Sequence, residues 1–387
     1  MAELFPRIDI SLTRAQAKYA KNGGNAFAFS LFKEVSKEAF GDMVISPLGI
    51  LFDLGMVANG AAGNTKAEIE GALGYEEDSL GVLNSFCKTM MENATVIDSS
   101  TTIGITNSVV RNSLQPALLE DFKMEMESDY FADFFSMVFG VDDVVSFVND
   151  WCKEKTHGLI TEILADQPDK NDYVYFLNAL YFKGIWSSPF KKRNTRREEF
   201  TTLSGTKKTV DMMSKVGHLN YGSTDLGSAV SLPFGNQAFQ MIFILPEKGK
   251  SLDDLRGALD LDSWGKLLGA MYDTNVDVKI PSFETPFSVD LQESLQRLGV
   301  KDAFNPLYAD FTKMTDHPVI IGKVLHKAYI KVDEQGSKAA AATAILMATT
   351  SPGPEQTVKF HADRPFIYAI TEKSTGAIFF LGQYTGN

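Results

Sequence analysis

Residues 334–359 read EQGSKAAAATAILMATTSPGPEQTVK, and the interpretation of this stretch decides the fold. Alanine is the strongest helix former, so local propensity predicts a surface helix over residues 339–344. As a β-strand, the stretch would place its odd-numbered residues from Ser337 to Thr349 on one face, because strand side chains alternate. Lys338 is the only charged residue in that span and falls on the other face. A strand of such small side chains could therefore slide between two others with its uncharged face on a core.

The stretch stops at residues 351–354, Ser-Pro-Gly-Pro, where the prolines interrupt any regular element. A long connection of small, apolar residues is unusual inside a compact domain. Long connections without secondary structure of their own are usually functional. These residues alone leave two alternatives, an alanine-rich surface helix and a functional loop.

Composition indicates an ordinary globular chain. Of 387 residues, 44% are apolar and 22% are charged, which excludes a disordered or low-complexity protein. The formal charge of −12 does not indicate a surface for nucleic acid or anionic membrane. We expect the basic cluster to be a solvated loop. It consists of Lys191, Lys192, Arg193, Arg196 and Arg197.

Cysteine and hydropathy patterns set further limits. Cys87 and Cys152 cannot form a disulfide framework, so we expect two free thiols. No apolar stretch approaches the roughly 18 residues of a membrane helix. The N-terminus lacks the basic-then-apolar pattern of a signal peptide. We find no Cys/His group with zinc-ligand spacing and expect no bound metal and no cofactor.

Helix signals dominate the first third of the chain. Ser46-Pro47 predicts a helix start, because serine accepts from the first free amides and proline suits the first turn. Residues 48–57 are apolar on all sides except Asp53, which predicts a buried helix. We expect Asp53 to face a polar neighbour. Further helices are predicted over residues 144–151 and over residues 291–298, the second ending at Gly299.

The second half is rich in β-branched and aromatic runs, so the chain is predicted to be an α+β protein with antiparallel or mixed sheets. The longest predicted strand is Tyr173–Trp186. The other strands are predicted at 240–245, 276–280, 328–332, 366–370 and 377–381.

Catalytic motifs are missing from the sequence. There is no GxSxG elbow, HExxH, P-loop or GxGxxG, and none of the five histidines stands beside a nucleophile motif. We therefore predict that the protein is not an enzyme and has no catalytic residue.

Several separate stretches, in the right order, resemble the serpin family of serine protease inhibitors over essentially the whole chain. They are 45–48 (ISPL), 60–65 (GAAGNT), 147–164 (FVNDWCKEKTHGLITEIL), 178–190 (NALYFKGIWSSPF), 326–344 (HKAYIKVDEQGSKAAAATA) and 364–384 (RPFIYAITEKSTGAIFFLGQY). The resemblance implies a single serpin domain over residues 1–387 with an exposed reactive-centre loop over about residues 335–357. It also implies three mainly antiparallel or mixed β-sheets and about eight to nine helices.

The resemblance gives roles to particular residues. Glu334 resembles the acidic residue at the base of the loop, and Trp186 the tryptophan near the top of the main sheet. The polar cluster that controls opening of this sheet is Ser46, Asn178 and His326. The hinge comprises Gly336, Ser337, Lys338, Ala339, Ala340, Ala341 and Ala342. Small residues without proline are typical of hinges in inhibitory serpins.

Four features depart from the family pattern. Lys338 stands where an acidic residue is usual, and strand alternation places it outward. Gly49 and Asp53 replace small residues more typical of the buried helix. Ser282 stands where a basic residue is common, so a salt bridge from Glu334 to that position is unavailable. Residues 79–92 carry no basic stripe, so we expect no activation by heparin.

The resemblance therefore implies an irreversible inhibitor that is cleaved as a substrate and inserts its hinge into the main sheet. The alternative is a non-inhibitory serpin that acts as a binding or carrier protein. The family's usual hinge length, counted from Glu334, places the reactive bond at Thr350–Ser351, with Ala348–Thr349 and Thr349–Thr350 as alternatives. Small uncharged residues there favour an elastase-like or subtilisin-like serine protease as partner.

We expect a monomer that binds no nucleic acid and does not insert into membranes. The resemblance also favours an extracellular or cell-envelope protein whose signal peptide has been removed, with an intracellular location as the alternative.

Overall fold

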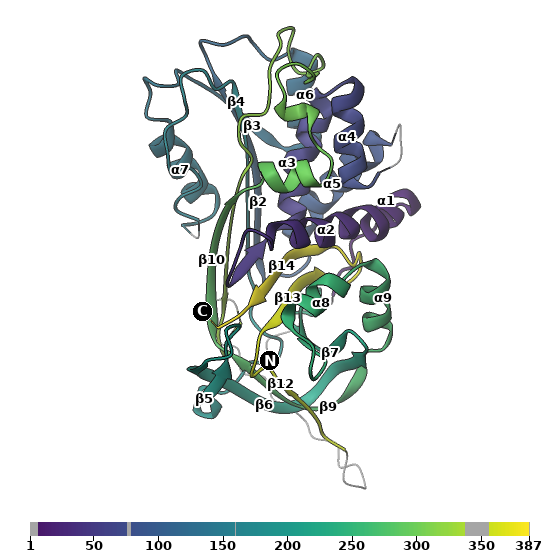
Figure 1. The fold of residues 1–387 in the computed structure, drawn as a ribbon. Helices are drawn as coiled ribbons and strands as arrows, with labels where there is room; N and C mark the ends of the chain where they lie inside the picture. Colours follow the sequence, from purple (N-terminus) through teal and green to yellow (C-terminus); the bar gives the residue numbers. More distant parts are fainter. Residues whose placement is uncertain (1–6, 76–78, 159, 337–355, 387) are drawn as a thin grey trace.

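A buried helix that begins at Ser46 runs through the helical half of the molecule (Figure 1). In this computed structural model, which describes residues 7–75, 79–158, 160–336 and 356–386, α3 spans Pro47–Gly60. The Ser46 hydroxyl accepts from the Gly49 amide at 3.2 Å, and every residue of α3 is buried. The predicted start and the predicted burial are both confirmed.

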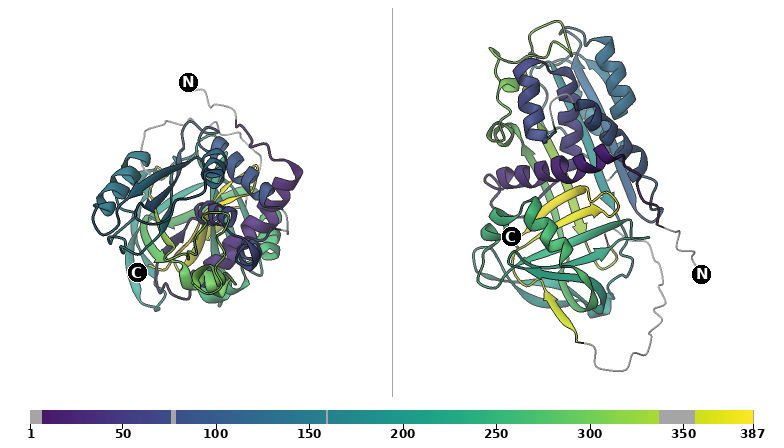
Figure 2. Two further views of the ribbon diagram at one scale, coloured as in Figure 1. Left: turned by 90° about the horizontal axis from the view of Figure 1, so that it is seen from above. Right: turned by 90° about the vertical axis from the view of Figure 1, so that its right-hand side faces the viewer.

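The helices of the first 130 residues gather in one half of the molecule, as the right view in Figure 2 shows. Those before residue 131 are α1 (Arg14–Tyr19), α2 (Asn25–Val35), α3, α4 (Gly63–Leu73), α5 (Leu80–Ala94) and α6 (Glu120–Tyr130). The later helices are α7 (Val144–Lys155), α8 (Leu252–Ala258), α9 (Leu261–Gly269) and α10 (Gln292–Arg297). The predicted helices at 144–151 and 291–298 correspond to α7 and α10.

The strands of the described residues form three sheets, so the α+β class is confirmed. The nine-stranded sheet has the order β1-β14-β13-β8-β7-β6-β9-β12, with β5 added beside β6. Its strands are β1 (Met43–Ile45), β5 (Arg196–Thr201), β6 (Lys207–Thr224), β7 (Gly227–Pro233), β8 (Phe239–Pro246), β9 (Tyr272–Pro281), β12 (Val358–His361), β13 (Phe366–Glu372) and β14 (Ile378–Tyr384).

Two smaller sheets stand beside each other along the length of the molecule (Figure 1). One has the order β3-β2-β4, with β2 at Thr102–Asn112, β3 at Ala132–Met137 and β4 at Val174–Lys183. The other pairs β10 (Phe283–Asp290) with β11 (Leu325–Val332). The predicted strand at 173–186 is therefore confirmed in its central part and ends earlier than expected.

Strand β4 is covered on both faces. One face packs on the main core, which includes α3, through Val174, Phe176, Leu180 and Phe182. The other face packs under α7 through Leu177, Ala179 and Tyr181. Burial on both faces explains why this strand reads as a nearly continuous apolar run.

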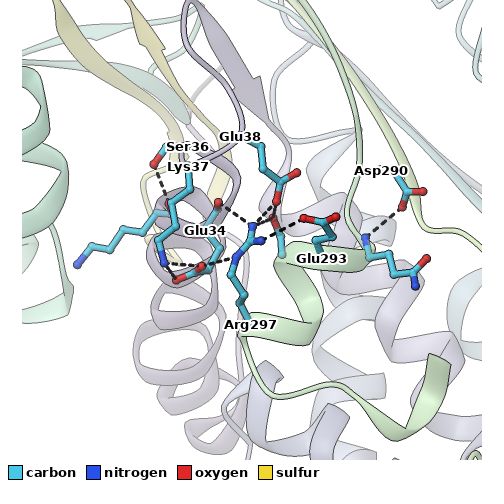
Figure 3. A network of polar contacts seen from close by, with 10 residues as sticks. Glu34, Ser36, Lys37, Glu38, Asp290, Glu293 and Arg297 are labelled. Carbon is cyan, nitrogen blue, oxygen red and sulfur yellow. Dashed lines mark hydrogen bonds and ion pairs between the residues drawn. The ribbon is translucent and has the colours of Figure 1, made fainter. Parts of the chain in front are cut away.

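A cluster of ion pairs ties α10 to the end of α2 (Figure 3). The Arg297 guanidinium binds Glu34 at 2.9 Å, contacts Glu38, and lies 3.5 Å from Glu293. Lys37 also binds Glu34 at 2.7 Å. These side chains are partly exposed, so the cluster fixes the orientation of α10 more than it adds to stability.

Candidate functional site

The edges of β4 and β11 face each other without a ladder of hydrogen bonds. Each strand is paired on its other edge, β4 with β2 and β11 with β10. Between β4 and β11 themselves, the described residues form no ladder, although the two strands are neighbours. We call this boundary the seam, defined by residues 174–183 and 325–332. Unpaired strand edges present amides and carbonyls to which another strand can add.

The two strands of the seam run in the same direction and meet at Gly336. Gly336 forms an antiparallel bridge to Ile185, just beyond β4, and another to Asp333, just beyond β11. The Asp333 and Gly336 backbones bond to each other at 3.0 and 3.2 Å. At Gly336 φ is +127°, and an added Cβ would lie 2.3 Å from the Gly184 carbonyl oxygen, so only glycine fits this position.

Trp186, just beyond β4, closes the same end of the seam, between the two smaller sheets. Its indole nitrogen donates to the Asp333 carbonyl at 2.9 Å, and its amide donates to the Gln335 carbonyl at 2.9 Å. The ring stacks on Phe234 with centroids 4.3 Å apart. Trp186 therefore fastens the turn that follows β11 to the end of β4.

Glu334 is held at this end by hydrogen bonds, and no basic side chain pairs with it among the described residues. Its carbonyl accepts from the Phe190 amide at 2.8 Å, and its carboxylate accepts from the Thr195 hydroxyl at 2.7 Å. The Ser282 hydroxyl instead donates to the Val332 carbonyl at 3.1 Å. Thr195 thus supplies the hydrogen bond to the Glu334 carboxylate, and sequence analysis missed it.

The predicted polar cluster does lie together, beneath the middle of the seam. The Ser46 amide donates to Nε2 of His326 at 3.1 Å, which joins α3 to β11. Asn178 of β4 donates to the Asn107 side chain of β2 at 2.8 Å. An added Cβ on Gly49 would lie 2.3 Å from the Asn178 side-chain oxygen, so the absence of a side chain lets α3 approach β4.

His326 is neutral in this setting. Burial lowers its pKa to about 3, and Nε2 accepts a hydrogen bond, so the imidazole proton lies on Nδ1. A charged imidazole here would lose both its solvation and the Ser46 contact. The cluster therefore acts as a structural clamp between α3, β4 and β11.

Two residues of this clamp were missed or left in doubt. Asn107 lies within the buried stretch of β2, and its side chain also donates to the Tyr130 carbonyl at 2.6 Å. Gly49 was a departure from the family pattern, and the approach of Asn178 now explains it. An asparagine inside a buried strand and a glycine inside a buried helix were the available signals.

The expectation for Asp53 was wrong. Its Oδ1 atom is buried and has no hydrogen-bond partner within the described residues. Burial raises the pKa of this carboxyl well above its usual value, because an apolar setting disfavours the charged form. Asp53 lines a small cavity of about 20 Å³ below the seam, together with Lys323 and mainly apolar side chains such as Val174 and Phe176.

The remaining predicted site residues lie outside the described residues. These are the hinge positions Ser337, Lys338, Ala339, Ala340, Ala341 and Ala342, and the bond residues Ala348, Thr349, Thr350 and Ser351. Gly336 is the last described residue before them and leaves from the end of the seam.

Other predicted features concern the surface and the thiols. Cys87 and Cys152 are free and buried, as predicted. The basic cluster of residues 191–197 is exposed except for the half-buried Thr195, which supports the solvated-loop interpretation. Within the ranges that the structure describes, no helix is both long and apolar enough to cross a membrane.

Comparison with known proteins identifies the family. The family model described as "Serpin (serine protease inhibitor)" matches residues 22–386. The chain belongs to the serpin family. It is 30% identical to iripin-2 of Ixodes ricinus, over 99% of this chain and 97% of the relative. It is also 30% identical to human leukocyte elastase inhibitor, over 93% of this chain and 97% of the relative.

The solved structures agree with this assignment. The native-state crystal structure of tengpin, a thermophilic serpin, matches with a TM-score of 0.87 and 30% identity. The match covers 99% of this chain and 97% of that one. The predicted serpin fold is therefore confirmed.

Proposed function

We propose that this serpin is an irreversible inhibitor of serine proteases and not a carrier protein. The observation that carries the proposal is the seam, which joins two parallel strands with unpaired edges and has Gly336 bridged to both at one end. A strand that continues from Gly336 back along the seam would run antiparallel to both neighbours and satisfy both edges.

The two bridges at Gly336 fix the register of such a strand. Counting back from them, residue 343 would lie opposite Asn178 of β4 and His326 of β11. Asn178 lies opposite Asn107 of β2, so Thr343 would complete a polar row across the sheet. Thr343 thus provides a hydroxyl opposite the polar residues of the seam, and the four positions before it, 339–342, are all alanine.

The same register supports the predicted alternation. Ala341 would lie opposite Leu180 and Ala328, which are 3% and 2% exposed and belong to the main core. Lys338 would lie opposite Lys183 and Lys331 on the outer face. Glu284 already pairs with Lys331, which offsets part of the repulsion among these cations. Insertion is therefore compatible with the lysine that departs from the family pattern.

The chemistry belongs to the protease. Its serine oxygen attacks the Thr350 carbonyl carbon, the peptide bond to Ser351 breaks, and the Ser351 nitrogen leaves as an amine after taking a proton. An ester then links Thr350 to the protease. Insertion of residues 337–350 would carry this ester roughly 45 Å, at about 3.3 Å per residue, before water completes hydrolysis. The serpin itself catalyses nothing.

The partner follows from the residues before the reactive bond. Met347, Ala348, Thr349 and Thr350 offer no positive charge to a pocket that ends in a carboxylate. A shallow pocket of the elastase or subtilisin type accepts such side chains. The similarity to leukocyte elastase inhibitor supports an elastase-like target.

Mixing the protein with pancreatic elastase tests the proposal. We expect a band on a denaturing gel with the summed mass of the two proteins, because the ester survives denaturation. The matched control is protein whose loop has been cut beforehand, which should give no such band. Complete loop cleavage without the larger band would instead support the carrier alternative.

A further inference from the structure

Residues 184–190, which follow β4, form the surface on which the end of β11 docks. Within this segment, Ile185 and Trp186 bind the turn at Gln335–Gly336, and the Phe190 amide binds the Glu334 carbonyl. The Ser187 hydroxyl donates to the Gly235 carbonyl at 2.8 Å. Whatever fixes this segment therefore also fixes the end of the seam.

Lys215 of β6 reaches the segment from the opposite side. Its ammonium donates a hydrogen bond to the Ser188 carbonyl and lies 4.6 Å from the centre of the Phe190 ring. One cation thus joins two residues of the segment, through a charge-assisted hydrogen bond and a cation–π contact. This contact has no part in the pairing of the strands or in the proposed insertion of the loop.

No carboxylate faces the Lys215 ammonium among the described residues. The segment 184–190 carries no titratable side chain, and Lys183 and Lys191 flank it. On β6 the nearest titratable residues in sequence are Asp211 and His218, and on β9 they are Asp277 and Lys279. Asp277 pairs with His361 of β12, and Lys279 pairs with Glu198 of β5. Glu334 is bound to Thr195.

We propose that Lys215 is a positioning residue whose ammonium holds residues 184–190 against the end of β11, so that it keeps the hinge end of the seam closed until cleavage. These two contacts of Lys215 depend on its charge, because a neutral amine loses the cation–π contact and forms a weaker hydrogen bond. Removal of the charge should loosen the bonds of Trp186 and Phe190 to the 333–335 turn.

The charge of Lys215 changes within an accessible range of pH. Burial lowers its pKa to about 8. The ammonium therefore predominates at pH 7 and the neutral amine at pH 9, so these contacts of Lys215 should weaken as pH rises between these values. Arginine at this position would stay charged throughout, because its pKa lies above 12.

Amide hydrogen exchange tests the proposal without any protease. We compare the wild type, Lys215→Arg, Lys215→Met and the control Lys191→Met, each at pH 7 and pH 9, and measure the Trp186 and Phe190 amides. At pH 7, Lys215→Met should exchange about tenfold faster than the wild type, and Lys191→Met should match the wild type.

The pH dependence separates a role for charge from a role in packing. From pH 7 to pH 9, the wild type should lose protection relative to Lys215→Arg when the two are compared at the same pH. A constant ratio of wild type to Lys215→Arg would overturn the proposal, as would a Lys215→Met variant as protected as Lys191→Met. If Lys215→Met does not fold, the comparison with Lys215→Arg still decides.

The consequence for inhibition rests on the proposed function. Without these contacts, stored Lys215→Met should lose inhibitory capacity faster than the wild type, because the seam opens before any protease arrives. If exchange behaves as expected and the wild type still forms no complex with elastase, the inhibitory function fails while the role of Lys215 stands.

Discussion

Replacement of Ala341 by glutamate should turn the inhibitor into a substrate without changing the residues that the protease reads. In the register set by Gly336, position 341 would insert between Leu180 and Ala328, whose side chains belong to the main core. Position 342 would insert on the other face, between Ala179, which is buried under α7, and Lys327 of β11, which lies 3.5 Å from Glu162. Ala342→Glu is therefore the matched control, because its carboxylate gains a cationic neighbour.

The size of the effect follows from the proton that the buried carboxyl must take up. A glutamate with a pKa of about 4.3 is neutralised at pH 7 at a cost of about 3.7 kcal/mol, which corresponds to a roughly 500-fold slower insertion. Burial of the ionised form costs more, so the carboxyl inserts in its neutral form and this figure is the cost of protonation alone. Burial in the same core raises the pKa of the Asp53 carboxyl well above its usual value. The cost falls by about 1.4 kcal/mol for each unit by which pH is lowered.

The assay measures how much cleaved loop and how much denaturation-resistant complex form with pancreatic elastase. We expect mainly complex from the wild type and Ala342→Glu, and mainly cleaved loop from Ala341→Glu. The ratio of complex to cleaved loop for Ala341→Glu should rise about tenfold from pH 7 to pH 6, relative to Ala342→Glu at each pH. Equal yields from the two variants would refute the register, and full inhibition by Ala341→Glu would refute insertion.

Three further predictions concern the target, the clamp and the buried acid. Thr350→Arg should create inhibition of trypsin and weaken that of elastase, and cleavage by trypsin without a complex would show that the reactive bond lies elsewhere. Burial lowers the His326 pKa to about 3, so the free energy of unfolding should fall as pH drops below about 6.5, by about 2 kcal/mol at pH 5. Urea unfolding of His326→Gln should show a decrease with pH that is smaller by this amount. Asp53→Leu should raise the free energy of unfolding by roughly 1–3 kcal/mol and therefore raise the urea midpoint. A lower midpoint would show that the carboxyl has a partner in solution.

The sequence predicted features that depend on neighbouring residues. The Ser46-Pro47 helix start and the amphipathic α7 both arise from local chemistry. The family resemblance added the fold and brought Ser46, Asn178 and His326 together. These residues are far apart in the chain, so neither spacing nor periodicity could have joined them.

The features that were missed depend on contacts between distant elements. Among the described residues Asp53 Oδ1 has no hydrogen-bond partner, and apart from Lys323 the side chains that line the cavity beside it are apolar, which the helix sequence does not reveal. Thr195 binds Glu334 across 139 positions, and Lys215 binds Ser188 across 27 positions. Strands β6 and β10 are half exposed and carry many polar residues, so their composition did not suggest strands.

The seam itself is a property of the register and could not be read from the sequence. Strands β4 and β11 each look like an ordinary buried strand, and only their pairing with β2 and β10 shows that the edges between them are unpaired. In this register, insertion of residues 337–349 as proposed would give the two faces of the predicted alternation definite neighbours on both sides.

The unfolding temperature of protein whose loop has been cut near Thr350 tests the central claim most directly. If the seam is a vacant strand position, the freed segment will insert, add hydrogen bonds to β4 and β11, and raise the melting temperature sharply above that of the intact protein. A nick in an ordinary exposed loop leaves stability unchanged or lower. Equal melting temperatures for cut and intact protein would contradict the insertion of residues 337–350 into the seam.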